Sequence, residues 1–188
     1  MHGTPSLSSA LRPSVARALI PGLLLGLAAM PSAALAAPAQ GEASAVVVRP
    51  LSFINYENLD FGRIIPATVA GTVTISTTNV RTQTNGIVLI GNDFQVARFA
   101  GRGVQNQRVR IQITPATVTL TGPGPAMTVS NLVIGPGTTL QQNGSSPNYR
   151  IVPANGIFFF TVGGRLNVGA KQPAGAYSGT FTATLDYQ

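Results

Sequence analysis

Apolar and polar residues alternate most regularly in the last twelve positions of the chain. From Tyr177 to Gln188 the odd positions carry Tyr, Gly, Phe, Ala, Leu and Tyr, and the even positions carry Ser, Thr, Asp or Gln. A period of two is typical of a β-strand with one buried and one exposed face. Threonine is also a poor helix former, so the pattern predicts a strand over residues 177–188.

Similar runs occur earlier in the chain. In residues 107–114, Val109, Ile111 and Ile113 alternate with arginine and glutamine, which predicts a strand with a basic outer face. Further strands are predicted at 71–76, 117–121 and 165–168, and the continuously apolar runs predict central strands at 87–90, 129–134 and 157–162. Asn-Gly, Gly-Pro and Gly163-Gly164 pairs between the runs predict turns. The pattern therefore predicts eight or nine short strands in a sandwich or barrel.

The first 36 residues predict a secretion signal that forms a helix and is cleaved. Arg12 and Arg17 precede an apolar stretch over residues 18–30, and small residues follow it. We expect cleavage after Ala36, with Ala34 as a weaker alternative, so that Ala37 becomes the new N-terminus. The apolar stretch is shorter than the about 20 residues of a membrane-spanning helix. These features predict export to the periplasm, the cell surface or the medium, with membrane contact only during export.

Removal of the signal changes the chemistry that the chain can perform. The only histidine is His2, and the chain has no cysteine. Ser-His-Asp and Cys-His catalysis need an imidazole base, and zinc sites are built mainly from His and Cys. The only close acidic pair, Glu57 and Asp60, is interpreted as loop polarity, and Asn92-Asp93 as a turn. We therefore expect no enzyme, no catalytic residue, no metal site and no cofactor.

The mature chain has the size of one domain. Two of the twelve basic residues leave with the signal, so ten remain against five acidic residues, a formal net charge of +5. Arg98 to Gly103 interleaves arginine, phenylalanine and glycine in a way that suits nucleic acid. Because export argues against a nucleic-acid partner, we interpret this stretch as a solvated loop. The predicted division is a signal at 1–36, an extension at 37–50 and a β-sandwich domain at 51–188.

Several separated motifs resemble a known family. They are Leu59–Ile64 (LDFGRI), Gly71–Ile75 (GTVTI), Leu166–Ala170 (LNVGA) and Gly175–Phe181 (GAYSGTF). In this order they are similar to the secreted bacterial family numbered 4402 among the domains of unknown function. The closing block also resembles the end of pilus subunits of the chaperone-usher route and of spore-coat-U-like proteins.

The resemblance to pilus subunits implies an immunoglobulin-like antiparallel sandwich that lacks its last strand. The N-terminal extension of a neighbouring subunit fills the gap in such proteins. Carried onto this sequence, the edge of the acceptor groove would be lined by Tyr177, Phe181, Leu185 and Tyr187. The donated face would be Ala43, Ala45 and Val47 or, in the other register, Val46 and Val48.

These observations favour a non-enzymatic exported structural or surface-assembly protein that polymerises by strand donation. The implied partners are copies of the chain or related subunits and a periplasmic chaperone, with no nucleic acid. A loose N-terminal tail is the simpler interpretation of residues 37–49. The alternative functions are a small outer-membrane β-barrel and an adhesive or carbohydrate-binding module. For the binding module, Tyr149 is the candidate exposed aromatic residue.

Overall fold

The computed structural model describes residues 42–47, 49–145 and 147–188, and the chain divides into two compact units, residues 1–44 and 45–188. The predicted cleavage residues Ala34, Ala36 and Ala37 lie outside the described residues, as does Val48. All described strands belong to the second unit. Within the part of the chain that is described, no helix is long and apolar enough to cross a membrane.

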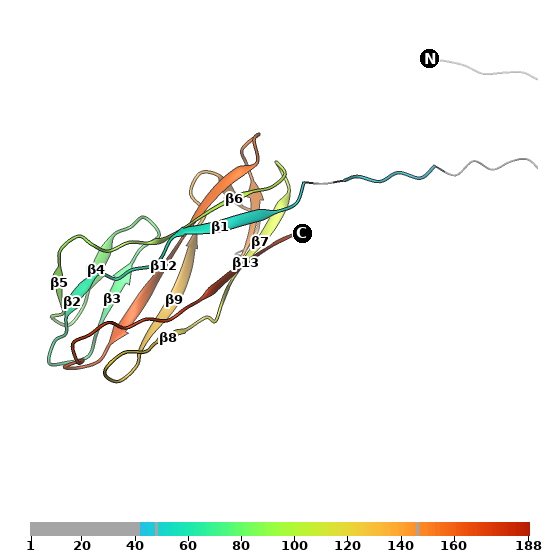
Figure 1. Cartoon of the computed structure of the whole chain (residues 1–188). Coiled ribbons are helices and arrows are strands. Elements are labelled where there is room, and N and C mark those ends of the chain that lie inside the picture. The colour runs from blue at the N-terminus through green and yellow to red at the C-terminus, as the bar shows by residue number, and fades with distance from the viewer. Residues whose placement is uncertain (1–41, 48, 146) are drawn as a thin grey trace, which may run out of the picture. The chain divides into compact units, whose positions relative to one another are not determined.

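The second unit consists of antiparallel strands in three sheets, which confirms the predicted all-β sandwich (Figure 1). The seven-stranded sheet contains β1 (Ser52–Glu57), β3 (Gly71–Ile75), β4 (Arg81–Gln83), β6 (Ala97–Arg102), β8 (Val118–Leu120), β9 (Met127–Gly135) and β12 (Ile157–Val168). The four-stranded sheet contains β10 (Leu140–Gln142), β11 (Asn148–Ile151), β7 (Arg108–Thr114) and β13 (Thr182–Tyr187). The third sheet pairs β2 (Arg63–Ile65) with β5 (Val88–Ile90). The described residues hold thirteen strands, more than the eight or nine expected. The sequence pattern did not predict β1, β2, β4, β6, β10 and β11, and three of these, β2, β4 and β10, have only three residues.

The central strand of the large sheet is β12, which pairs with β6 and β3 along one edge and with β9 along the other. The sequence predicted two strands here with a turn at Gly163-Gly164, and this prediction was wrong. The glycines lie inside one continuous strand, at an irregularity in the pairing with β9. A Cβ atom at Gly163 would lie 2.5 Å from the carbonyl oxygen of Ile75, so glycine permits close approach of the neighbouring backbone.

The structure corrects two further predictions, one in the seven-stranded sheet and one in the two-stranded sheet. Residues 98–103 were predicted as a solvated loop, but most of them form β6, which lies between β1 and β12. Its side chains Ala97 and Phe99 are buried, so Arg98 and Arg102, at the alternate positions, occupy the opposite face. Residues 87–90 were predicted as a central strand, but β5 pairs with β2 alone, and Val88 is 52% exposed. Only Ile87, just before β5, is fully buried.

The core forms two adjoining clusters of buried side chains. One lies between the seven-stranded and four-stranded sheets, and the other lies between the seven-stranded sheet and the segments around β2 and β5. In one cluster the rings of Phe99 and Phe160 stack with their centroids 4.7 Å apart. Tyr149 of β11 belongs to the same cluster and is 2% exposed. The prediction that Tyr149 is an exposed binding residue was therefore wrong, because it lies on the inner face of its strand. Phe181 packs against both clusters.

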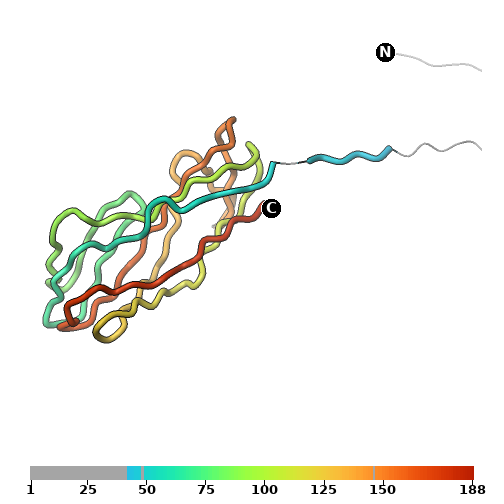
Figure 2. The backbone as a smooth tube through the Cα atoms, viewed as in Figure 1, coloured from blue at the N-terminus to red at the C-terminus, as the bar shows by residue number. Residues whose placement is uncertain are grey.

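The C-terminal strand begins later than predicted. β13 covers Thr182–Tyr187 and pairs only with β7, with Leu185 opposite Ile111 and Tyr187 opposite Val109. Residues 177–181 leave β7, and Ser178 instead forms an isolated bridge with Thr121. Figure 2 shows the C-terminal segment and the segment containing β1 and β2 along the same side of the domain. The second edge of β13 carries no paired strand among the described residues.

Candidate functional site

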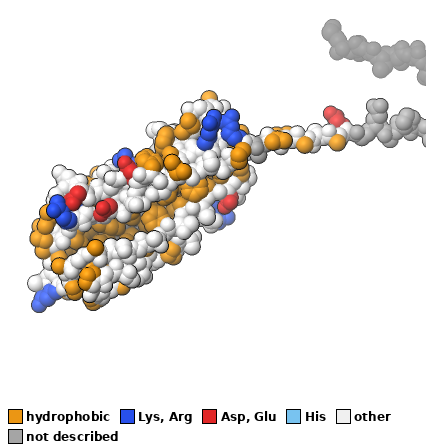
Figure 3. Space-filling view, viewed as in Figure 1, with side chains coloured by type: hydrophobic (Ala, Val, Ile, Leu, Met, Phe, Trp, Pro, Cys, Tyr) orange, Lys and Arg blue, Asp and Glu red, His pale blue; other side chains and the backbone are white. Residues whose placement is uncertain are grey.

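An open groove of about 890 Å³ runs along the side of the domain between residues 58–66 and residues 172–181. Its floor consists of apolar side chains from three strands of the large sheet: Val118, Leu120, Met127, Val129, Leu166 and Val168. Figure 3 shows hydrophobic side chains gathered along a hollow on this face. Five of these floor side chains are at most 7% exposed and belong to a core cluster, and only Leu120 is half-buried, so the groove reaches down to the core between its two walls.

One wall of the groove is the chain segment that leads into β13. Tyr177 donates a hydrogen bond from its hydroxyl group to the carbonyl of Pro173, at 3.0 Å. Gln172 is 9% exposed and donates through Nε2 to the carbonyl of Pro125 at 2.5 Å. The backbones of Ser178 and Thr121 exchange two hydrogen bonds. The contacts of Gln172 and Ser178 attach this wall to the loop after β8, so hydrogen bonds keep the wall in place beside the groove.

The opposite wall, residues 58–66, is attached to the large and small sheets. Asp60 and Gln95 exchange two backbone hydrogen bonds of 2.8 Å, and the Asp60 carboxylate accepts a bond from the Gly62 amide. Gly62 has φ of 69°, and a Cβ atom there would lie 2.5 Å from the Arg81 guanidinium. Glycine is therefore the residue that this turn accommodates.

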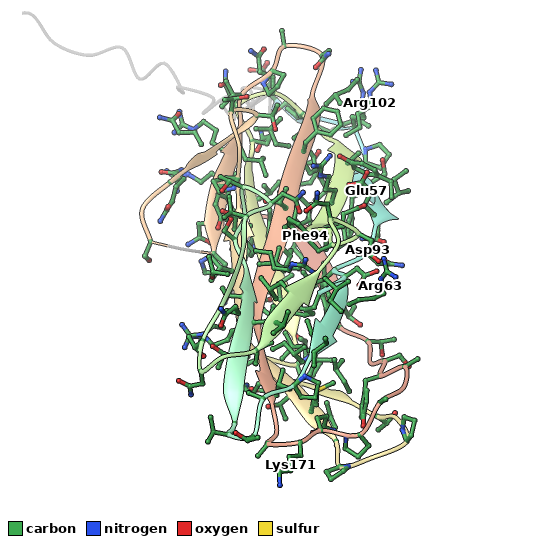
Figure 4. The ribbon with its side chains drawn as sticks, turned by 90° about the vertical axis from the view of Figure 1, so that its left-hand side faces the viewer. Glu57, Arg63, Asp93, Phe94, Arg102 and Lys171 are labelled. Atoms are coloured by element: carbon green, nitrogen blue, oxygen red, sulfur yellow. The ribbon has the colours of Figure 1, made fainter. Side chains whose placement is uncertain are left out.

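The side chain of Arg81 stabilises this wall through hydrogen bonds and a contact with an aromatic ring. Its guanidinium donates hydrogen bonds to the carbonyl oxygens of Phe61 and Gly91, at 3.0 and 2.6 Å, and lies 4.5 Å from the centroid of the Phe94 ring. Arg63 forms an ion pair with Asp93 at 2.9 Å nearby, and Figure 4 shows these two side chains together. The charged side chains along this wall thus serve to position it.

Replacing Arg81 with methionine should lower the free energy of unfolding by about 2 kcal/mol, because the carbonyl groups of Phe61, Ile90 and Gly91 lose a charged donor. Urea unfolding of the mature chain measures this change. Replacing Arg165 with methionine is the matched control, because Arg165 is exposed and no hydrogen bond of its side chain is found among the described residues. Equal effects of the two substitutions would contradict a positioning role for Arg81.

Each acidic residue considered in the sequence analysis makes its own separate contact. Glu57 forms an ion pair with Arg98, 3.0 Å between Oε2 and Nε, with a geometry too bent for a hydrogen bond. Asp60 accepts its bond from Gly62, and Asp93 pairs with Arg63. In the described ranges, no group of three or more His, Cys, Asp or Glu side chains is placed to hold a metal ion.

The four residues predicted to line an acceptor groove divide into two pairs. Tyr177 and Phe181 line the groove. Leu185 and Tyr187 lie farther along β13, half-buried against the core cluster that contains Phe160. The Tyr187 hydroxyl accepts a hydrogen bond from the amide of Val104 at 2.9 Å and donates one to the carbonyl of Arg49 at 3.1 Å. Their role in binding a donated strand stays a prediction.

The described residues of the predicted donor segment are exposed and form no strand. Ala43 and Ala45 are exposed, and Val46 and Val47 are 88% and 96% exposed. Sequence reasoning did not identify the floor residues or the wall at 58–66 as parts of a site. The LDFGRI motif was a signal for that wall, but alternation cannot show which strands face an open groove.

Comparison with known proteins identifies one relationship. The family model described as Domain of unknown function (DUF4402) matches residues 51–187. No curated protein and no solved structure matches the chain. The matched region contains both walls and the floor of the groove and every described strand. By this match over most of its length, the chain belongs to the DUF4402 family.

Proposed function

We propose that the chain is a non-enzymatic structural subunit of an exported assembly, in which the groove receives the N-terminal segment of another copy as an added strand. The single observation that carries this proposal is the groove itself. It is a hollow of about 890 Å³ between two bonded walls, lined at its base by apolar side chains of the core, and it adjoins a strand whose second edge is unpaired among the described residues.

An extended peptide suits such a groove for two reasons. Its backbone can form hydrogen bonds with the free edge of β13, which begins one residue after the groove wall, and alternate side chains can point toward the core beside the inward side chains of that strand. The inward positions of β13, Ala183, Leu185 and Tyr187, are only half-buried. An added strand would complete their burial, and each buried methylene group contributes about 0.8 kcal/mol.

The residues at 43–48 suit the role of donor. They lie just before β1, are exposed where described, and include three consecutive valines, which favour extended backbone. Six extended residues span about 20 Å. The alanines among them bury little area, so we expect the affinity of one donor segment for one groove to be modest.

The mature chain, residues 37–188, should assemble into oligomers or filaments, and the chain beginning at residue 50 should stay a folded monomer. The shorter chain retains every residue of both core clusters, so it should fold without the extension. Size-exclusion chromatography and electron microscopy measure assembly, and circular dichroism measures folding. Assembly of the shorter chain to the same extent would refute the proposal.

A double substitution tests the donor within the mature chain. Val46→Asp with Val47→Asp places a charge on the inward face in either register, so assembly should fall by at least about tenfold. Val80→Asp with Val133→Asp is the matched control, because these valines are 55% and 54% exposed on the domain. Equal losses of assembly would point to a general charge effect instead of an inserted strand.

The volume of the groove favours one second candidate function, the binding of an apolar small molecule. Small-molecule sites commonly measure about 300–1,000 Å³ and have mostly apolar linings, and this groove falls within that range. If the mature chain stays monomeric at high concentration and binds one fluorescent fatty-acid analogue per chain, this second function replaces assembly.

A further inference from the structure

Three arginines occupy the outward face of the four-stranded sheet, on the side away from the core. Arg108 and Arg110 lie on β7 and alternate with buried Val109, and Arg150 lies on β11 beside buried Tyr149. The strand register places Arg108 directly opposite Arg150. Residues on one face are about 7 Å apart along a strand and about 5 Å apart across strands. The three arginines therefore form one compact basic patch on this face.

No arginine of this patch forms an ion pair within the described part of the domain, and only one carboxylate, that of Asp186, lies on a paired position of the same face. The ion pairs found there belong to Arg63 and Arg98. Asp186 lies opposite Arg110 on β13 but forms no ion pair within the described ranges. Like charges placed directly opposite each other destabilise a sheet. The face thus keeps an unfavourable pair that an anionic partner would relieve.

A small polar recess adjoins the patch. It has a volume of about 130 Å³ and is lined by Gln141, Gln142, Asn143 and Arg150. The Asn143 Nδ2 group is buried and has no hydrogen-bond acceptor in the described structure. Buried donors are nearly always satisfied, so the unpaired donor next to an arginine leaves a place in the recess for an acceptor, which water or an anionic group from outside can fill.

We propose that this face binds an anionic polysaccharide, with sulfate, phosphate or carboxylate groups on Arg108, Arg110 and Arg150. Arginine matches such groups through paired hydrogen bonds. Gln112, Gln141 and Asn148 lie on the same face, and their amides can bond sugar hydroxyl groups. Single-stranded nucleic acid needs aromatic side chains for base stacking, and the outward positions of β7 and β11 carry none.

The mature chain should bind dextran sulfate and not uncharged dextran, and added salt should weaken binding by screening. Arg108→Gln with Arg150→Gln should weaken binding by about tenfold for each arginine. Arg165→Gln with Lys171→Gln removes the same net charge from outside the patch. It should change the affinity for dextran sulfate by less than about threefold relative to the unsubstituted chain. Isothermal titration calorimetry measures the affinities, with the oligomeric state of each variant checked by chromatography.

Three outcomes would overturn this proposal. They are no binding of dextran sulfate, equal weakening by the two double substitutions, or tighter binding of single-stranded DNA at matched charge. Equal weakening would mean that only net charge matters, and tighter DNA binding would assign the patch to nucleic acid. The Arg108 and Arg150 substitutions leave the groove intact, so failure here is separate from failure of the assembly proposal.

Discussion

Replacing Phe160 with alanine should lower the free energy of unfolding by about 3–5 kcal/mol. Phe160 is 1% exposed on the central strand β12, and its ring stacks on Phe99 at 4.7 Å with the planes 4° apart. The substitution therefore removes a buried ring and its stacking contact with Phe99. Neighbouring strands hold this part of the core in place, so it cannot easily close the cavity. Urea unfolding of the mature chain, followed by circular dichroism, measures the loss.

The neighbouring residue supplies a matched control. Phe159 precedes Phe160 on β12 but points to the opposite face and is 46% exposed. Phe159→Ala should therefore cost at most about 1 kcal/mol. Equal costs for the two substitutions would contradict the register of β12, because a shift of one residue exchanges the two faces of a strand.

Local alternation predicted those strands that have one face on the core. Residues 107–114 were predicted from Val109, Ile111 and Ile113, and β7 covers 108–114 with its apolar side chains inward. The pattern is reliable there because burial itself has a period of two. The same reasoning failed for β6, where Arg98, Gly101 and Arg102 resemble loop residues. That segment is a strand because neighbours on both edges pair with its backbone.

The groove could not be predicted from any local pattern. Its walls, residues 58–66 and 172–181, are more than one hundred positions apart in the sequence, and its floor comes from β8, β9 and β12. Each wall is placed by long-range bonds, such as those from Arg81 to Phe61 and from Gln172 to Pro125. The sequence motif of the C-terminal block located Tyr177 and Phe181 on one wall without showing what faces them.

Appending the donor segment to the end of the chain should raise the free energy of unfolding by about 2–3 kcal/mol, because a tethered strand reaches the free edge of β13, next to the groove, at millimolar effective concentration. β13 ends at Tyr187, one residue before the C-terminus. An Asn-Gly turn added after Gln188 can therefore return the chain antiparallel along the free edge of β13. The variant begins at residue 50, so that the appended copy is its only donor.

Two versions of this variant distinguish the two donor registers. Starting the appended segment at residue 42 or at residue 43 turns opposite faces inward. The inward residues are Ala43, Ala45 and Val47 in the first version and Ser44, Val46 and Val48 in the second. The first should stabilise more, by about 1 kcal/mol, because the second buries the Ser44 hydroxyl beside Tyr187. Urea unfolding measures both, with Val47→Asp in the first version as the control that should abolish its gain. Equal gains would mean that the segment does not enter as an ordered strand, and no gain in either would remove the basis for strand donation.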